Sequence, residues 1–248
     1  MLNTTVAMAL LDRGVTLNWD DGATLHKITA QVRYHTQHSA SIQTLRIGAQ
    51  QKISDEPLTL TASDSAIEAH WIWGERGAGF STALVVRNKS EADLFIDALE
   101  VIRIDSAFGG VFGLGAPTGL WRCAREDDPR DWEAWSDSAG SAGGFARQDV
   151  LVVQPSMSNR SQPPAVMIRA LGAEKQPAAA RDEGGLAVAL PQTGIPSEMR
   201  LEVSGERFER FIARARADGL RLAPGVSLGS PEYWIVAGDD AAELLALT

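Results

Sequence analysis

Apolar and polar residues alternate along most of this chain, and an alternation of two residues is the period of a half-buried β-strand. The alternation is clear in Leu25–Tyr34, Leu94–Asp105 and Ala165–Leu171. Further runs of the same kind are Val15–Trp19, Ala66–Trp73, Phe80–Arg87, Asp149–Gln154, Leu186–Leu190 and Met199–Val203. Clusters of Gly, Pro, Asn and Asp separate the runs, as turns between strands require. The pattern predicts an all-β chain that forms a large antiparallel β-sandwich with few short helices.

Two segments test this expectation. Phe208–Ala217 fits an amphipathic helix as well as a strand, but Asp218-Gly219 follows it and is a typical hairpin turn, so we expect a strand and a hairpin there. Asp239–Leu247 begins with acids and continues with leucines, which predicts the start of a helix. Long loops rich in Gly, Ser and Pro are expected at Gly109–Gly119, Glu126–Gly144 and Gln154–Pro164.

The segment Gly119–Ser138 carries the most distinctive side chains of the chain. It holds three of the seven tryptophans and six acidic residues. A Trp face covers the apolar face of a pyranose, and carboxylates accept hydrogen bonds from its hydroxyls, so the segment is a candidate sugar contact. The candidate residues are Trp121, Asp131, Trp132, Glu133 and Trp135. The alternative is that the tryptophans fill the core and the acids belong to a solvated loop.

Composition narrows the possible partners. The chain has 248 residues, is 44% hydrophobic and carries a net charge of −9, so nucleic acids and anionic membrane surfaces are poor partners. We expect no membrane span, because no apolar run approaches the length of about 18 residues that a span needs. The single cysteine, Cys123, gives no internal disulfide, and the first residues do not resemble a signal peptide. These features predict a cytoplasmic protein.

Motifs for cofactors and metals are weak. The glycines of Gly109–Gly119 are not followed by a helix, which a dinucleotide-binding fingerprint requires. His35 and His38 lie three apart near a strand end, where they would point to opposite faces. We therefore expect neither a cofactor nor a metal site.

Several motifs in order resemble those of the N-terminal β-domain of glycoside hydrolase family 36, the α-galactosidase-type enzymes. Asp131–Ser138, DWEAWSDS, resembles the tryptophan motif of that domain, although Glu133 and Ala134 depart from its usual residues. LFIDALEVIRID precedes it, and ARQDVLVVQP and AVMIRALG follow it, as similar strands do in the family. Leu222–Thr248 is similar to the passage that closes the domain, so the resemblance covers residues 15–248.

The resemblance implies a β-supersandwich similar to galactose mutarotase over residues 1–235. Residues 236–248 would then start a helix or linker leading to a catalytic (β/α)8 barrel, which carries both catalytic aspartates in the family. No catalytic residue is therefore transferred to this chain. The family domain helps shape the active-site rim and supports oligomerisation, so a barrel, a galactoside-type sugar and a second copy of the chain are expected partners.

Three functions follow from these observations. The first is a non-catalytic domain of an α-galactosidase-like enzyme, which would carry an apolar contact patch to which Trp71, Trp73 or Trp234 could contribute. The alternative for these tryptophans is the core. The second function is a free-standing carbohydrate-binding module. The third is a mutarotase-type enzyme, with His70 and a glutamate of the acidic segment as proton donor and acceptor.

Overall fold

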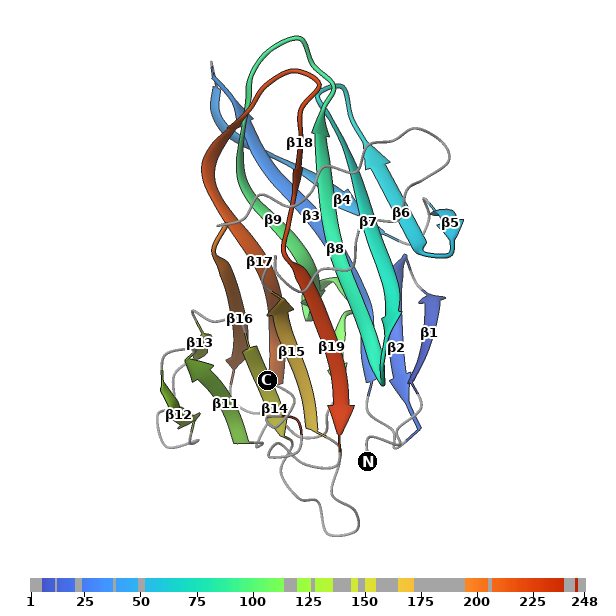
Figure 1. Cartoon of the computed structure of the whole chain (residues 1–248), viewed down its shortest axis with the longest axis vertical. Coiled ribbons are helices and arrows are strands. Elements are labelled where there is room, and N and C mark those ends of the chain that lie inside the picture. Colours follow the sequence, from blue (N-terminus) through green and yellow to red (C-terminus); the bar gives the residue numbers. More distant parts are fainter. Residues whose placement is uncertain are drawn as a thin grey trace.

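The computed structural model of the chain contains two antiparallel β-sheets that pack face to face (Figure 1). It describes residues 6–11, 13–20, 24–37, 39–48, 52–113, 120–125, 128–135, 144–146, 150–154, 165–171, 195–204, 207–238 and 244. The predicted all-β sandwich is confirmed. Within these residues, no helix has the length and apolar character needed to cross a bilayer.

The first sheet has nine strands in the order β1-β2-β3-β9-β17-β16-β13, with β4 and β10 also paired to β3. Their bounds are β1 Val6–Leu11, β2 Gly14–Trp19, β3 Thr24–Thr36, β4 Ser39–Ile47, β9 Leu94–Asp105, β10 Val111–Gly113, β13 Gly144–Ala146, β16 Ser197–Ser204 and β17 Arg207–Leu222. A short 3-10 turn, η2, covers Ser106–Phe108 and joins β9 to β10.

The second sheet has ten strands in the order β12-β11-β14-β15-β19-β8-β7-β6-β5, with β18 paired to β8. Their bounds are β5 Lys52–Asp55, β6 Leu58–Ser63, β7 Ile67–Arg76, β8 Gly79–Asn88, β11 Leu120–Arg125, β12 Asp128–Trp135, β14 Val150–Gln154, β15 Ala165–Leu171, β18 Ser227–Gly229 and β19 Glu232–Gly238. This sheet lies in front in Figure 1.

A single apolar layer fills the space between the sheets. Trp71 and Trp73, both on β7, are fully buried in it and meet edge to face, with ring centroids 5.1 Å apart. Leu99 and Phe211 reach the same layer from β9 and β17. Two of the three tryptophans that were candidates for a contact patch are therefore core residues, as large aromatic side chains usually are when a sheet can bury them.

The predicted strands are confirmed wherever the structure describes the chain, but three expectations about turns and loops are wrong. Phe208–Ala217 is a strand, yet β17 continues through Asp218-Gly219 instead of turning back as a hairpin. Arg216 and Leu220 of β17 are four residues apart, but their partners on β9 are only two residues apart. The extra residues of β17 form a bulge, in which Asp218 and Gly219 have positive φ. Likewise, the loops expected over Gly109–Gly119 and Glu126–Gly144 contain strands β10 and β12. Leu186–Leu190 lies outside the described residues.

A partly buried hydrogen bond ties the two sheets together near their ends. The Tyr34 hydroxyl on β3 donates to Oδ2 of Asp64, in the turn between β6 and β7, at 2.7 Å. Oδ1 of Asp64 accepts from the backbone N–H groups of Ala66 and Ile67, which fixes the carboxylate. Burial, and then the nearby carboxylate, raises the pKa of Tyr34 well above its usual value, so the phenol stays a donor.

Close approach of β8 and β19 requires a glycine at position 79. A Cβ atom there would overlap the backbone oxygen of Ile235, whereas a Cβ atom at Gly74 would lie 3.8 Å from Ser81 Oγ, an ordinary contact. We expect Gly79→Ala to lower the free energy of unfolding by about 1–3 kcal/mol, because the two strands must move apart. Gly74→Ala is the matched control and should change it by less than about 0.5 kcal/mol. Urea unfolding of both variants measures the difference, and equal stabilities would contradict the prediction.

Candidate functional site

The tryptophan-rich acidic segment forms a hairpin rather than a surface loop. In its backbone, Trp121 on β11 pairs with Trp135 on β12, and Cys123 pairs with Glu133. The other edge of β11 pairs with β14, so the hairpin continues the ten-stranded sheet at one of its ends. The side chains of the five candidate residues, which also include Asp131 and Trp132, lie outside what the structure describes. Their contact with sugar stays a prediction.

The histidines have different neighbours. His35 Nδ1 lies 3.1 Å from Asp97 Oδ2, and its ring stacks on Phe95. His70 Nε2 lies 3.8 Å from Glu68 Oε1 on the same strand. His38 lies outside the described residues, so the expected separation of His35 and His38 is not tested. In the described part of the chain, no three His, Cys, Asp or Glu side chains gather as a metal site would require.

A continuous group of ionic side chains crosses the outer face of the nine-stranded sheet, and sequence analysis did not find it. Register places Gln31, Glu100, Arg214 and Glu198 side by side on β3, β9, β17 and β16. We call the whole group the ionic face. It comprises Gln31, Glu100, Arg103, Asp105, Glu198, Arg200, Glu202, Arg210 and Arg214.

Arg103 lies at the centre of the ionic face and bridges two buried carboxylates. Glu100 is only 2% exposed, and its Oε2 accepts from Gln31 Nε2 at 2.7 Å and from Arg103 Nη1 at 2.9 Å. Asp105 Oδ2 accepts from Arg103 Nη2 and, at 3.0 Å, from Arg210 Nε. Charge-assisted hydrogen bonds of this kind offset the cost of burying both carboxylates.

Arginine partners also hold the carboxylates on β16. Glu198 Oε2 accepts from Nε and Nη2 of Arg214 at 3.1 and 2.8 Å. Glu202 lies 2.8 Å from Arg200 Nε and 3.5 Å from Arg210 Nη1. Arg210 therefore links Asp105 on one strand with Glu202 two strands away.

A bulge in β9 places Arg103 on the ionic face. Glu100 and Arg103 are three residues apart, and in a regular strand they would point to opposite faces. On β3, however, the partners of Arg103 and Glu100 are Thr29 and Gln31, which are only two residues apart. The partners on β17 are also two residues apart, so β9 contains one extra residue over this stretch. The extra residue is absorbed at Val101 and Ile102, which are both buried in the core. Arg103 thereby points outward beside Glu100.

The chemistry of the ionic face favours a structural role. Glycoside hydrolysis needs two carboxyl groups that flank the scissile bond and exchange protons with substrate or water. Here, the carboxylates of Glu100, Asp105, Glu198 and Glu202 each accept hydrogen bonds or lie within ion-pair distance of arginine. Such partners hold the carboxylates in place. The ionic face is therefore built for rigidity rather than proton transfer.

We expect the Arg103→Ala variant to lower the free energy of unfolding by about 2–4 kcal/mol, because it leaves two buried carboxylates with one partner fewer each. Arg103 is 14% exposed. Arg221→Ala is the control: Arg221 is 67% exposed and pairs with Asp93, so its removal should cost less than about 1 kcal/mol. Thermal and urea unfolding of both variants provide the measurement. A loss for Arg103→Ala no greater than that for Arg221→Ala would show that the ionic face contributes little.

Comparison with known proteins gives the fold a context. No protein-family description matches the sequence, and no curated protein matches it at the sequence level. Among solved structures, the chain is similar to the A355E variant of the family 36 α-galactosidase AgaA from Geobacillus stearothermophilus in complex with 1-deoxygalactonojirimycin. The TM-score is 0.52 and the identity 12%, over 84% of this chain. The galactosidase domain of the α-galactosidase-sucrose kinase AgaSK matches with a TM-score of 0.50 and 11% identity over 86% of this chain.

A polysaccharide lyase also matches, with a TM-score of 0.52 and 12% identity over 98% of the chain. In each case the chain spans only about a third of the matched protein: 30% of AgaA, 30% of the AgaSK domain and 34% of the lyase. The similarity is therefore one of fold, and it is confined to one part of larger carbohydrate-active enzymes. The chain has the β-sandwich fold that forms this part of family 36 α-galactosidases.

Proposed function

We propose that the chain is the non-catalytic N-terminal β-sandwich domain of an α-galactosidase-like glycoside hydrolase. In this role it shapes the rim of the substrate site and supports assembly with a (β/α)8 barrel, in cis or in trans, and with further copies of itself. The observation that carries the proposal is the match of 84–86% of this chain to only 30% of two α-galactosidase structures. The rest of those proteins has no counterpart here.

The carboxylates of the described residues support the non-catalytic half of the proposal. The buried acids of the ionic face are held by arginine, and the Tyr34 hydroxyl occupies Asp64. A retaining or inverting glycosidase instead keeps its two carboxyl groups open to the sugar. Catalysis in the complete enzyme is then the task of the barrel.

Activity and assembly can be tested together. We expect the purified chain to release no nitrophenol from nitrophenyl α-galactoside above the rate in buffer. We also expect the coding region adjoining that of residue 248 to encode a (β/α)8 barrel, and the barrel to copurify with this chain and hydrolyse the same substrate. Hydrolysis by the chain alone would overturn the non-catalytic role. A barrel that is fully active and does not associate with the chain would overturn the role in assembly.

The hairpin of β11 and β12 is a second place where function can be tested, because it carries the candidate sugar contacts. We expect Trp132→Ala and Trp135→Ala each to weaken binding of a galactoside by this chain at least about tenfold, since an aromatic stacking surface is removed. Isothermal titration calorimetry with melibiose measures the affinity. Arg221→Ala, which changes an exposed side chain, serves as the control. An affinity that neither tryptophan substitution changes, or no binding at all, would exclude the hairpin as the contact.

A further inference from the structure

The outer face of the ten-stranded sheet carries a tryptophan that does not belong to the core. Trp234 on β19 lies between Tyr233 and Ile235, both fully buried in the apolar layer. Because alternate residues of a strand point to opposite faces, Trp234 points away from that layer, and it is partly exposed. It thus differs from Trp71 and Trp73, which have no exposed surface.

The indole of Trp234 lies across the neighbouring strand. Its Nε1–H donates to the backbone oxygen of Arg76 on β7 at 3.2 Å. Strand β8 lies between β19 and β7, and register places Ser81 next to Trp234 and Gly74 next to Ser81. Neighbouring strands are about 4.8 Å apart, so an indole that starts on β19 and reaches β7 must extend over β8.

Small residues of β8 leave space for the ring. Ser81 opposes Trp234, and Gly79 opposes Val236 two residues further along the same face. With only a hydroxymethyl group and a hydrogen atom beneath it, the indole can lie flat on the strand. An indole in this position can pack one face on β8 and direct its other face away from the sheet.

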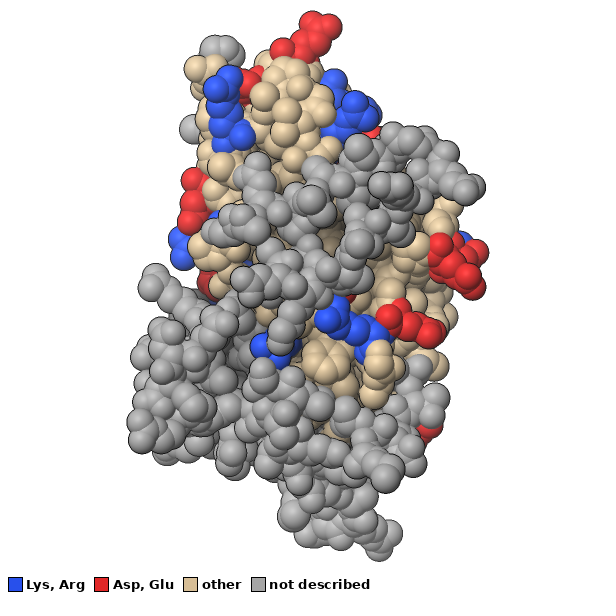
Figure 2. All heavy atoms as spheres, viewed as in Figure 1, with Lys and Arg blue, Asp and Glu red and all other residues tan. Residues whose placement is uncertain are grey.

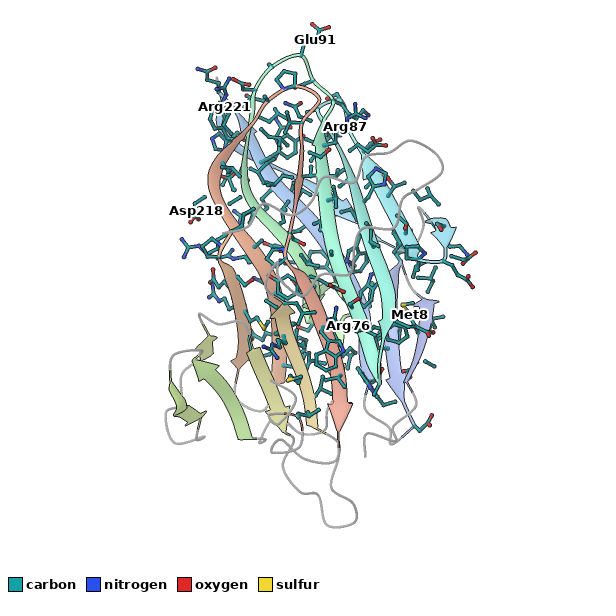
Figure 3. The ribbon with its side chains drawn as sticks, in the orientation of Figure 1. Met8, Arg76, Arg87, Glu91, Asp218 and Arg221 are labelled. Carbon is teal, nitrogen blue, oxygen red and sulfur yellow. The ribbon has the colours of Figure 1, made fainter. Side chains whose placement is uncertain are left out.

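An ion pair accompanies the ring. Arg76 Nη1 lies 3.2 Å from Glu232 Oε2, and this pair also reaches from β7 to β19. The two side chains are 30% and 12% exposed, so both retain hydrogen-bonding capacity toward solvent. Figure 3 shows Arg76 in the middle of this face, and Figure 2 shows basic and acidic side chains gathered there.

We propose that Trp234, with the Arg76–Glu232 pair, forms a binding site for a pyranose ring of a carbohydrate. A pyranose has an apolar C–H face, which stacks on an indole, and vicinal hydroxyls, which both donate and accept. Arg76 supplies donors and Glu232 supplies acceptors. The hydrogen bond from Nε1 and the ion pair fix the ring and the polar groups before a ligand arrives, which lowers the entropic cost of binding.

The charge of the chain favours a neutral sugar ring over a polyanionic ligand. Within the site, Glu232 pairs with Arg76, and Arg169 of β15 lies next to Trp234 in the register. The chain as a whole carries a charge of −9, which disfavours nucleic acids and other polyanions. The site uses none of the residues of the β11–β12 hairpin, and it goes beyond the role proposed for the domain as a whole.

The test uses the full chain and two probes, methyl α-galactopyranoside and methyl α-glucopyranoside. Labelling the indole nitrogens with ¹⁵N gives one N–H signal for each of the seven tryptophans, and the mild substitution Trp234→Phe identifies the signal of Trp234. We expect at least one glycoside to shift this signal at concentrations of roughly 1–50 mM, the range of weak single-ring binding. Trp234→Ala should then weaken binding at least about tenfold, while Trp234→Phe retains part of the affinity.

Phe108→Ala is the matched control, because Phe108 is an aromatic residue, 53% exposed, on the turn that follows β9 of the other sheet. The affinity of the Phe108→Ala variant for the glycoside should stay within about twofold of that of the unmodified chain. No shift of the Trp234 signal with either glycoside, or equal weakening by Trp234→Ala and Phe108→Ala, overturns the proposal. The shift of the Trp234 signal is measured on the labelled unmodified chain, so this part of the test stands even if the Trp234→Ala variant does not fold. Neither result bears on association with a barrel, so failure of this site is distinguishable from failure of the proposed function.

Discussion

The structure depends on one constraint: two sheets bury a single apolar layer between them, so each strand must present apolar side chains on its inner face. What remains free to vary is the outer side of each sheet. On the nine-stranded sheet, the outer positions of β9, β17 and β16 are filled by arginines and carboxylates that neutralise one another. On the ten-stranded sheet, the corresponding positions of β19 and β8 carry Trp234 and small residues. The core thus confines polar and aromatic functional groups to the outer faces, and the outer residues of each sheet determine which groups these are.

Much of the sandwich could be predicted from alternation alone, because a strand with one buried face leaves this trace in the sequence. Leu94–Asp105 and Ala165–Leu171 have the same bounds in the structure as in the pattern. Other strands were not predicted. β1 is apolar at every position and β5 is too short to show a period, whereas β6, LTLTAS, alternates and was overlooked. The Asp218-Gly219 pair was read as a turn because a hairpin and a bulge use the same backbone conformations there.

The ionic face could not be predicted, because its members come from four strands that are distant in sequence. Gln31 and Glu100 are 69 residues apart, and only the pairing of β3 with β9 brings them together. The available signals were the alternate charged residues of β17, at positions 210, 214 and 216, and of β16, at positions 198, 200 and 202, which mark a polar outer side. Conversely, the most distinctive motif of the sequence, the Trp/acid segment, produced a hairpin whose side chains the structure does not describe.

The fold and the surface side chains of the chain are two separate observations. The shared fold relates the chain to one part of α-galactosidases and of a polysaccharide lyase, at identities of 11–12%. On the nine-stranded sheet, the carboxylates of the ionic face are held by arginine. On the ten-stranded sheet, the partly exposed Trp234 lies near the Arg76–Glu232 pair.

The bulge of β9 has a consequence for how this chain can evolve. Exchange of a core residue at position 101 or 102 leaves the phase of the strand intact, and neighbouring side chains can accommodate the change. Loss of one residue there would remove the bulge and leave Glu100 and Arg103 two positions apart, in step with the neighbouring strands. Regular alternation would then keep Arg103 and Asp105 on the outer face and Ile104 on the apolar layer. Lineages that share the ionic face could therefore keep the acid and the arginine at a spacing of either three or two.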